Sequence, residues 1–214
     1  VGNLVYIDFA DPDNPVIEKI DFPFDETSYS LCITNTHGSH ADLTNEYASV
    51  PEEMKSVAKL FNKEYLNELT TFDILMNLNT LREQVSDRAI LRALHFCEET
   101  KRAQLEAQAL KDKNFDEFIR LVKKSGESSY KYLQNVFVNS DPEHQNVSIA
   151  LCTSDIILSD LEASRVHGGG FAGTIQAFVK NENIDNYKKA MDSIFGEGSC
   201  EVLAIRPFGG MRVL

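Results

Sequence analysis

The sequence predicts an α+β fold, an antiparallel sheet with helices packed on one face, and three observations carry that prediction. Strand-like segments open the chain, amphipathic helical segments fill its middle, and a strand, loop, strand, helix, strand unit closes it. This order favours an α+β domain over a parallel doubly wound one. The 214 residues are 43% hydrophobic and 25% charged, as in a globular domain that buries a sizeable core.

The opening strands read as a β-hairpin over residues 4–22. Apolar and polar residues alternate before the turn "DPDNP", and an extended pattern resumes after it. A third strand is predicted over residues 29–35. We expect the three strands to form an antiparallel sheet edge together.

Five helices are predicted between this sheet edge and the closing unit. They are a helix with Pro51 in its first turn, then helices over residues 71–82, 86–111, 114–125 and 146–160. Ser86 and Asp87 cap the longest of them, whose polar later half should face solvent. The stretch "SGESS", residues 125–129, should break the fourth helix.

The closing unit contains strands at residues 164–167, 174–180 and 200–206 and a helix at residues 184–195. A glycine-rich loop joins its first two strands, and the turn "GEGS" precedes its last strand.

Charge and cysteine usage exclude several classes of protein. The net charge of −12 opposes nonspecific binding to nucleic acid or anionic membrane. No apolar run approaches the ~20 residues of a membrane span, and no secretion signal opens the chain, so we expect a cytoplasmic protein. The four cysteines, Cys32, Cys97, Cys152 and Cys200, lie far apart in apolar stretches and predict buried, reduced thiols.

The glycine loop, from Gly168 to Gly173, is the first candidate binding site. Its residues are Gly168, Gly169, Gly170, Phe171, Ala172 and Gly173. Successive N–H groups in a glycine nest can point at one phosphate group. Neither the Walker nor the dinucleotide spacing is present, so from the glycines alone a tight strand-to-strand turn is the better interpretation.

A polar loop at residues 34–49 is the second candidate. His37 and His40 lack a third ligand at suitable spacing, so loop-bonding or solvent-exposed histidines are favoured over a metal site. Tyr47 offers a ring and a hydroxyl, which suit one face and one hydroxyl of a sugar, although alone it reads as a core or rim residue.

Residues 92–110, within the helix predicted at residues 86–111, carry glutamates and arginines that favour a structural role. Glu98 and Arg102 are four residues apart, as in a surface ion pair on a helix. The sequence contains no Ser-His-Asp arrangement, HExxH motif or Walker lysine.

Three segments together, in this order, resemble galactokinases of the GHMP small-molecule kinase family. They are "TNTHGSHADLTNEYASVPEEM", "RALHFCEETKRAQLEAQALKDKNFDEFIRL" and "SRVHGGGFAGTIQAF", and the resemblance spans about residues 1–206. It implies a C-terminal GHMP domain: a ferredoxin-like antiparallel sheet with helices and an added helical layer. By this resemblance residues 1–214 form one domain, whose strands within residues 1–35 continue from an absent N-terminal domain.

The resemblance also implies an activity. The whole protein would transfer the γ-phosphoryl of ATP to the anomeric hydroxyl of galactose with Mg²⁺. Tyr47 would contact the sugar, and the loop from Gly168 to Gly173, with Phe171, would lie by the sugar and the triphosphate. The catalytic Asp and the phosphate loop would belong to the N-terminal domain, so this chain would hold no catalytic or metal-binding residue and would be inactive alone. Without that partner domain its exposed apolar surface would favour a homodimer.

Two alternatives remain open from the sequence. The stretch at residues 124–146 diverges from the galactokinase pattern, which motivates an amino-sugar or heptose kinase of the same family. A noncatalytic sugar sensor is the alternative from another class.

Overall fold

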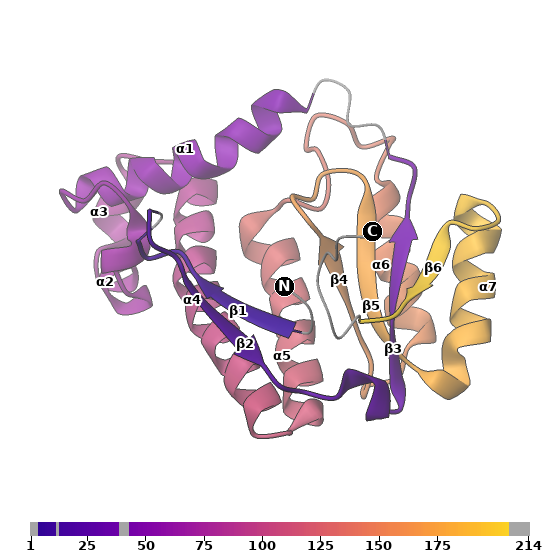
Figure 1. Ribbon diagram of the computed structural model, residues 1–214. Helices are drawn as coiled ribbons and strands as arrows, with labels where there is room; N and C mark the ends of the chain where they lie inside the picture. Colours follow the sequence, from indigo (N-terminus) through magenta and orange to yellow (C-terminus); the bar gives the residue numbers. More distant parts are fainter. Residues whose placement is uncertain (1–3, 12, 39–42, 206–214) are drawn as a thin grey trace, which may run out of the picture.

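The computed structural model describes residues 4–11, 13–38 and 43–205 (Figure 1). Its strands are β1 (Leu4–Asp8), β2 (Val16–Ile20), β3 (Tyr29–Asn35), β4 (Ala163–His167), β5 (Thr174–Lys180) and β6 (Cys200–Leu203). Its α-helices are α1 (Thr44–Leu60), α2 (Thr71–Met76), α3 (Leu78–Arg82), α4 (Asp87–Lys111), α5 (Phe115–Ser128), α6 (Asn146–Ile157) and α7 (Ile184–Phe195). A π-helical turn, η3 (Ser129–Leu133), continues α5. The described residues also contain short 3₁₀ turns at η1 (Phe24–Glu26), η2 (Leu66–Glu68) and η4 (Asn181–Asn183).

The four-stranded antiparallel sheet has the order β4-β5-β3-β6, which confirms the predicted α+β class. The hairpin of β1 and β2 is confirmed, but it forms a separate two-stranded sheet. The prediction that β3 joins this hairpin was therefore wrong. β3 is an interior strand, because it pairs with β5 on one side and with β6 on the other.

Side chains of β5 alternate between the two faces of the sheet. Each face has its own helices (Figure 1). Ala177 and Val179 pack with Tyr187 and Met191 of α7. Phe178 points the other way and packs with residues of α5 such as Ile119. The helical layer added to the sheet domain, α4 and α5, thus lies on the face opposite α7.

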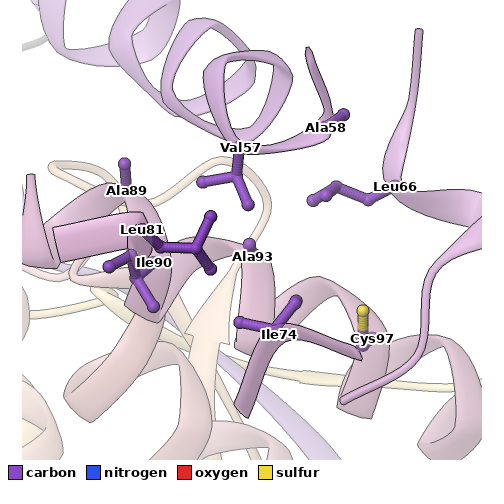
Figure 2. Packing of buried hydrophobic residues seen from close by; sticks show 9 residues of the cluster. All are labelled: Val57, Ala58, Leu66, Ile74, Leu81, Ala89, Ile90, Ala93 and Cys97. Atoms are coloured by element: carbon purple, nitrogen blue, oxygen red, sulfur yellow. The ribbon is translucent and has the colours of Figure 1, made fainter. Parts of the chain in front are cut away.

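A separate hydrophobic core lies between α1, α4 and the short helices α2 and α3. Figure 2 shows its side chains pointing toward one another. They are Val57, Ala58, Leu66, Ile74, Leu81, Ala89, Ile90, Ala93 and Cys97. This cluster packs the later half of α1 against α4.

Several predicted helix boundaries were wrong for physical reasons. α1 begins at Thr44, so Pro51 lies inside the helix rather than in its first turn. The helix predicted at residues 71–82 is interrupted at Asn77 and forms α2 and α3. "SGESS" does not break the helical run, because α5 extends to Ser128 and continues as η3. Gly126 lets α5 approach β4, since a Cβ at this position would lie 2.8 Å from the carbonyl oxygen of Ser164.

The end of α4 is less exposed than its polar sequence predicts. Ala107 and Leu110 are buried against Ile20 of the hairpin, so this half of the helix supports the second sheet. Ser86 caps α4 by accepting a hydrogen bond from the N–H of Ala89, as predicted.

All four cysteines are free thiols, as predicted, and three of them are buried. Cys152 is exposed on α6, which corrects the expectation that it is buried. No helix in the described ranges is both long and apolar enough to cross a bilayer.

A buried histidine makes the stability of this layer depend on pH. His95 of α4 is 8% exposed, and its Nδ1 lies 2.9 Å from Oγ of Ser128. Burial lowers the pKa of His95 to about 4, and the positive charges of Arg165 and Arg102 act in the same direction. The folded protein therefore holds the imidazole neutral at a pH where the unfolded chain binds a proton.

We expect the stability that neutral His95 contributes to be complete above the ordinary pKa of 6.5 and to be lost as the pH falls toward 4. Between pH 7.5 and pH 5 the wild-type chain should lose about 2 kcal/mol more than His95→Asn, whose amide does not titrate. Urea unfolding at the two pH values measures this difference. Equal losses in the two proteins would contradict the assignment to His95.

Candidate functional site

The glycine loop connects the antiparallel neighbours β4 and β5, so it is the tight strand-to-strand turn that the sequence favoured. Positive φ angles occur at Gly168 (76°), Gly170 (83°) and Gly173 (95°). Phe171 also has a positive φ, 58°, which is rare for a residue with a large side chain. A strained residue of this kind persists only where its surroundings hold it, and it often marks a functional loop.

Glycine is required at the centre of the loop because neighbours approach its backbone. A Cβ on Gly169 would lie 2.8 Å from Cε1 of Tyr47, and a Cβ on Gly170 would lie 2.0 Å from the carbonyl oxygen of Asn135. By contrast, no atom lies within 4 Å of a Cβ built on Gly168. The middle of the loop is therefore packed against protein, while its start faces open space.

Tyr47 holds the loop from one side. Its hydroxyl donates a hydrogen bond to the carbonyl oxygen of Gly170 at 2.8 Å, and its ring meets that of Phe171 edge to face at 5.4 Å. Burial raises the pKa of Tyr47, so the phenol stays protonated and keeps its donor. Sequence reasoning placed Tyr47 in a loop, but it lies in the first turn of α1, which fixes its direction.

Asn135 also holds the loop, from the segment that follows η3, and sequence reasoning did not identify it. Its side-chain amide donates to the carbonyl oxygen of Gly169 at 3.2 Å, and its own carbonyl oxygen accepts from the N–H of Phe171. Asn135 is 4% exposed and follows Gln134, whose φ of 56° ends the helical turn. No sequence pattern distinguishes it, since its partners are backbone groups distant in the chain.

The far end of the loop is joined to the end of β3. The N–H and hydroxyl of Thr36 both donate to the carbonyl oxygen of Gly173, at 2.8 and 2.7 Å. Three separate segments therefore fix the loop, and its conformation is set by the fold rather than by its own sequence.

Two backbone donors at the start of the loop remain available. Gly168 and Gly169 are exposed, and neither N–H has a protein acceptor among the described residues. Gly169 lies beside the Tyr47 ring, and neither glycine has a side chain that would block access to its N–H. This arrangement fits close approach by an anionic group such as a phosphate.

Of the two histidines in the second candidate site, the structure describes His37. Nε2 of His37 lies 3.0 Å from Oγ of Ser199, which confirms a loop-bonding histidine. His40 lies outside the described residues. Within the described ranges, no three His, Cys, Asp or Glu side chains come together as metal ligands.

The ion pairs on α4 differ from the prediction. Glu98 pairs with Lys101 at 3.6 Å, and Arg102 pairs with Glu99, so the predicted Glu98–Arg102 pair was wrong. Spacings of three and four residues both face one side of a helix, and here the three-residue spacing is used. The structural reading of this helix is supported by these contacts.

Two cavities lie away from the packed centre of the glycine loop. One, of about 580 Å³, is lined by α5, α6 and the start of β4 and includes Cys152, but neither Tyr47 nor a loop residue. The other, of about 310 Å³, borders the loop at Thr174 and includes His37 and Ser199.

Comparison with known proteins gives consistent relatives, although no family model matches the chain. The galactokinase of Actinobacillus pleuropneumoniae serotype 3 is 25% identical over 161 residues, 75% of this chain and 40% of the relative. The Homo sapiens galactokinase is 30% identical over 152 residues, 71% of this chain and 36% of the relative. The Thermotoga maritima galactokinase is 28% identical over 195 residues, 86% of this chain and 51% of the relative.

Solved structures give the same fold. The Lactococcus lactis galactokinase, crystallised with galactose, superposes with a TM-score of 0.72 at 20% identity and covers 91% of this chain and 48% of that one. The L. major mevalonate kinase, crystallised with R-mevalonate, has a TM-score of 0.54 at 12% identity and covers 92% of this chain and 47% of that one. The chain thus spans about half or less of the length of the relatives it matches. The chain is similar in sequence to galactokinases, it has the fold shared by galactokinase and mevalonate kinase, both GHMP kinases, and it fits a C-terminal portion of a galactokinase.

Proposed function

We propose that this chain belongs to a galactokinase-like sugar kinase that transfers the γ-phosphoryl of ATP to the anomeric hydroxyl of galactose. The observation that carries the proposal is a pair of exposed glycines, Gly168 and Gly169, whose N–H groups have no acceptor among the described residues. Gly169 lies beside the ring of Tyr47. The N–H groups suit a phosphate, and the Tyr47 ring suits a sugar. The galactokinase relatives, and the galactose in the Lactococcus lactis structure, support the choice of substrate class.

The residues of this chain would bind and orient. The N–H groups of Gly168 and Gly169 would hold phosphate oxygens without a charged side chain. Such local donors are needed because the net charge of −12 repels an anionic ligand. The Tyr47 hydroxyl donates to the carbonyl oxygen of Gly170, and we propose that the aromatic ring packs against one face of the sugar. When bound, Mg-ATP supplies the phosphoryl group and neutralises its developing charge.

The remaining parts of the site would come from an N-terminal GHMP domain of the same protein, including the catalytic Asp, the second phosphate loop and the ligands of Mg²⁺. An apolar face of the hairpin supports such a neighbour. Val5, Ile7 and Ile17 lie on the hairpin face turned away from α4, and they are 38%, 39% and 56% exposed. In the absence of that domain, we propose that the same face joins two copies of this chain.

The proposal is tested by a panel of acceptor sugars presented with Mg-ATP to the full-length gene product. Phosphorus NMR of the products should show a new anomeric phosphate with galactose, and far less with N-acetylgalactosamine or a heptose. Preference for one of those sugars would assign the protein to another kinase of the same fold. Galactose binding without any phosphorylated product would instead favour a sugar sensor.

A further inference from the structure

A fully buried arginine lies behind the glycine loop. The side chain of Arg92, on α4, is 0% exposed. Its Nε donates to the carbonyl oxygen of Leu133 at 3.0 Å, and its Nη1 donates to Oγ of Ser49 at 2.9 Å and to Glu53 at 3.0 Å. Its Nη2 has no acceptor among the described residues. A buried donor without a partner lowers stability, so the fold holds this arginine at a cost in free energy.

The two elements that Arg92 joins are the ones that clamp the loop. Ser49 and Glu53 lie on α1, the helix that also carries Tyr47 and its hydrogen bond to Gly170. Leu133 ends η3, two residues before Asn135, which bonds Gly169 and Phe171. The Arg92 guanidinium therefore connects α1, which carries Tyr47, to the end of η3, which precedes Asn135.

The geometry requires the planar fork of a guanidinium. Nε and Nη1 point at acceptors on two different elements in fixed directions, which a single ammonium on a flexible stem cannot reproduce. Arg88 is a natural comparison, because its guanidinium also bonds Glu53, at 3.0 and 3.1 Å. Its side chain is 32% exposed and makes no bond to Leu133 or Ser49.

We propose that Arg92 is a positioning residue for the glycine loop. It acts through Leu133 on Asn135, and through Ser49 and Glu53 on Tyr47, and so holds the N–H groups of Gly168 and Gly169 in place for an anion. The measurement of kcat/KM in its test rests on the proposed kinase function, whereas the measurement of hydrogen exchange in the loop does not.

The test compares Arg92→Lys with Arg88→Lys in the full-length gene product. We expect Arg92→Lys to lower kcat/KM for Mg-ATP about tenfold to a hundredfold, as a small misplacement of a binding group does, and Arg88→Lys to change it less than about threefold. Hydrogen exchange at the N–H of Phe171, which bonds Asn135, should be about tenfold faster in Arg92→Lys and unchanged in Arg88→Lys. Ser49→Ala removes one acceptor of Arg92 and should shift both readouts in the same direction by less.

A core variant separates positioning from general loss of stability. Ile74→Val weakens the cluster between α1 and α4 without touching Arg92 or the loop, and it should leave exchange at Phe171 unchanged. Equal exchange at Phe171 in Arg92→Lys and Arg88→Lys would overturn the proposal. If the wild-type protein lacks kinase activity, the proposed function fails, and the exchange comparison still decides the role of Arg92.

Discussion

Replacing Gly170 with alanine is expected to destabilise the domain by about 2 to 5 kcal/mol, from the combined cost of overpacking and of a left-handed backbone at a residue with a Cβ. The new Cβ would lie 2.0 Å from the carbonyl oxygen of Asn135 and 2.6 Å from its Nδ2, at a φ of 83°. Asn135 cannot move away easily, because it is buried and bonded to the loop on both sides.

Gly168→Ala provides the matched control two residues earlier. It has a similar φ of 76°, but nothing lies within 4 Å of the new Cβ, so only the backbone cost of about 1 to 2 kcal/mol applies. Urea unfolding of the three proteins measures both losses. If Gly168→Ala were as destabilising as Gly170→Ala, the contact with Asn135 would not explain the need for glycine.

Replacing Glu53 with glutamine is expected to cost about 3 to 5 kcal/mol of unfolding free energy, because it leaves a buried arginine without its counter-charge. Glu53 accepts from Arg92, whose side chain is 0% exposed, and from the partly exposed Arg88. Arg88 can reach water after the change, but Arg92 cannot.

Glu68→Gln is the surface counterpart of this change. Its ion pair with Lys63 has side chains that are 57% and 38% exposed, so losing it should cost no more than about 1 kcal/mol. Chemical denaturation of both variants at pH 7 gives the comparison. A loss for Glu53→Gln as small as that for Glu68→Gln would show that Arg92 does not depend on this carboxylate.

The sequence predicts much of this fold because its helices and strands follow local patterns. The alternation before "DPDNP" gives the hairpin, and the cap at Ser86 gives the start of α4. Prediction failed where a distant contact decides the structure. Gly126 reads as a helix breaker, but it allows α5 to approach β4.

The candidate site was predictable only in part, for the same reason. The glycines indicate a loop with positive φ angles, and the family resemblance indicates Tyr47 as a sugar contact. The sequence does not reveal Asn135, whose partners are backbone groups of Gly169 and Phe171 in the loop between β4 and β5. Nor does it reveal the role of Arg92, whose acceptors come from α1 and η3. Both residues act through contacts between elements far apart in the chain, which no local pattern encodes.

The most direct test of the central claim is ADP release dependent on both galactose and Mg-ATP. It is measured on the full-length gene product and, beside it, on the 214-residue chain. We predict turnover from the full-length protein and none from the 214 residues alone, because Tyr47 and the glycine loop would form only one wall of the site. Turnover by the 214-residue chain, or none by a full-length protein that binds both ligands, would contradict this account.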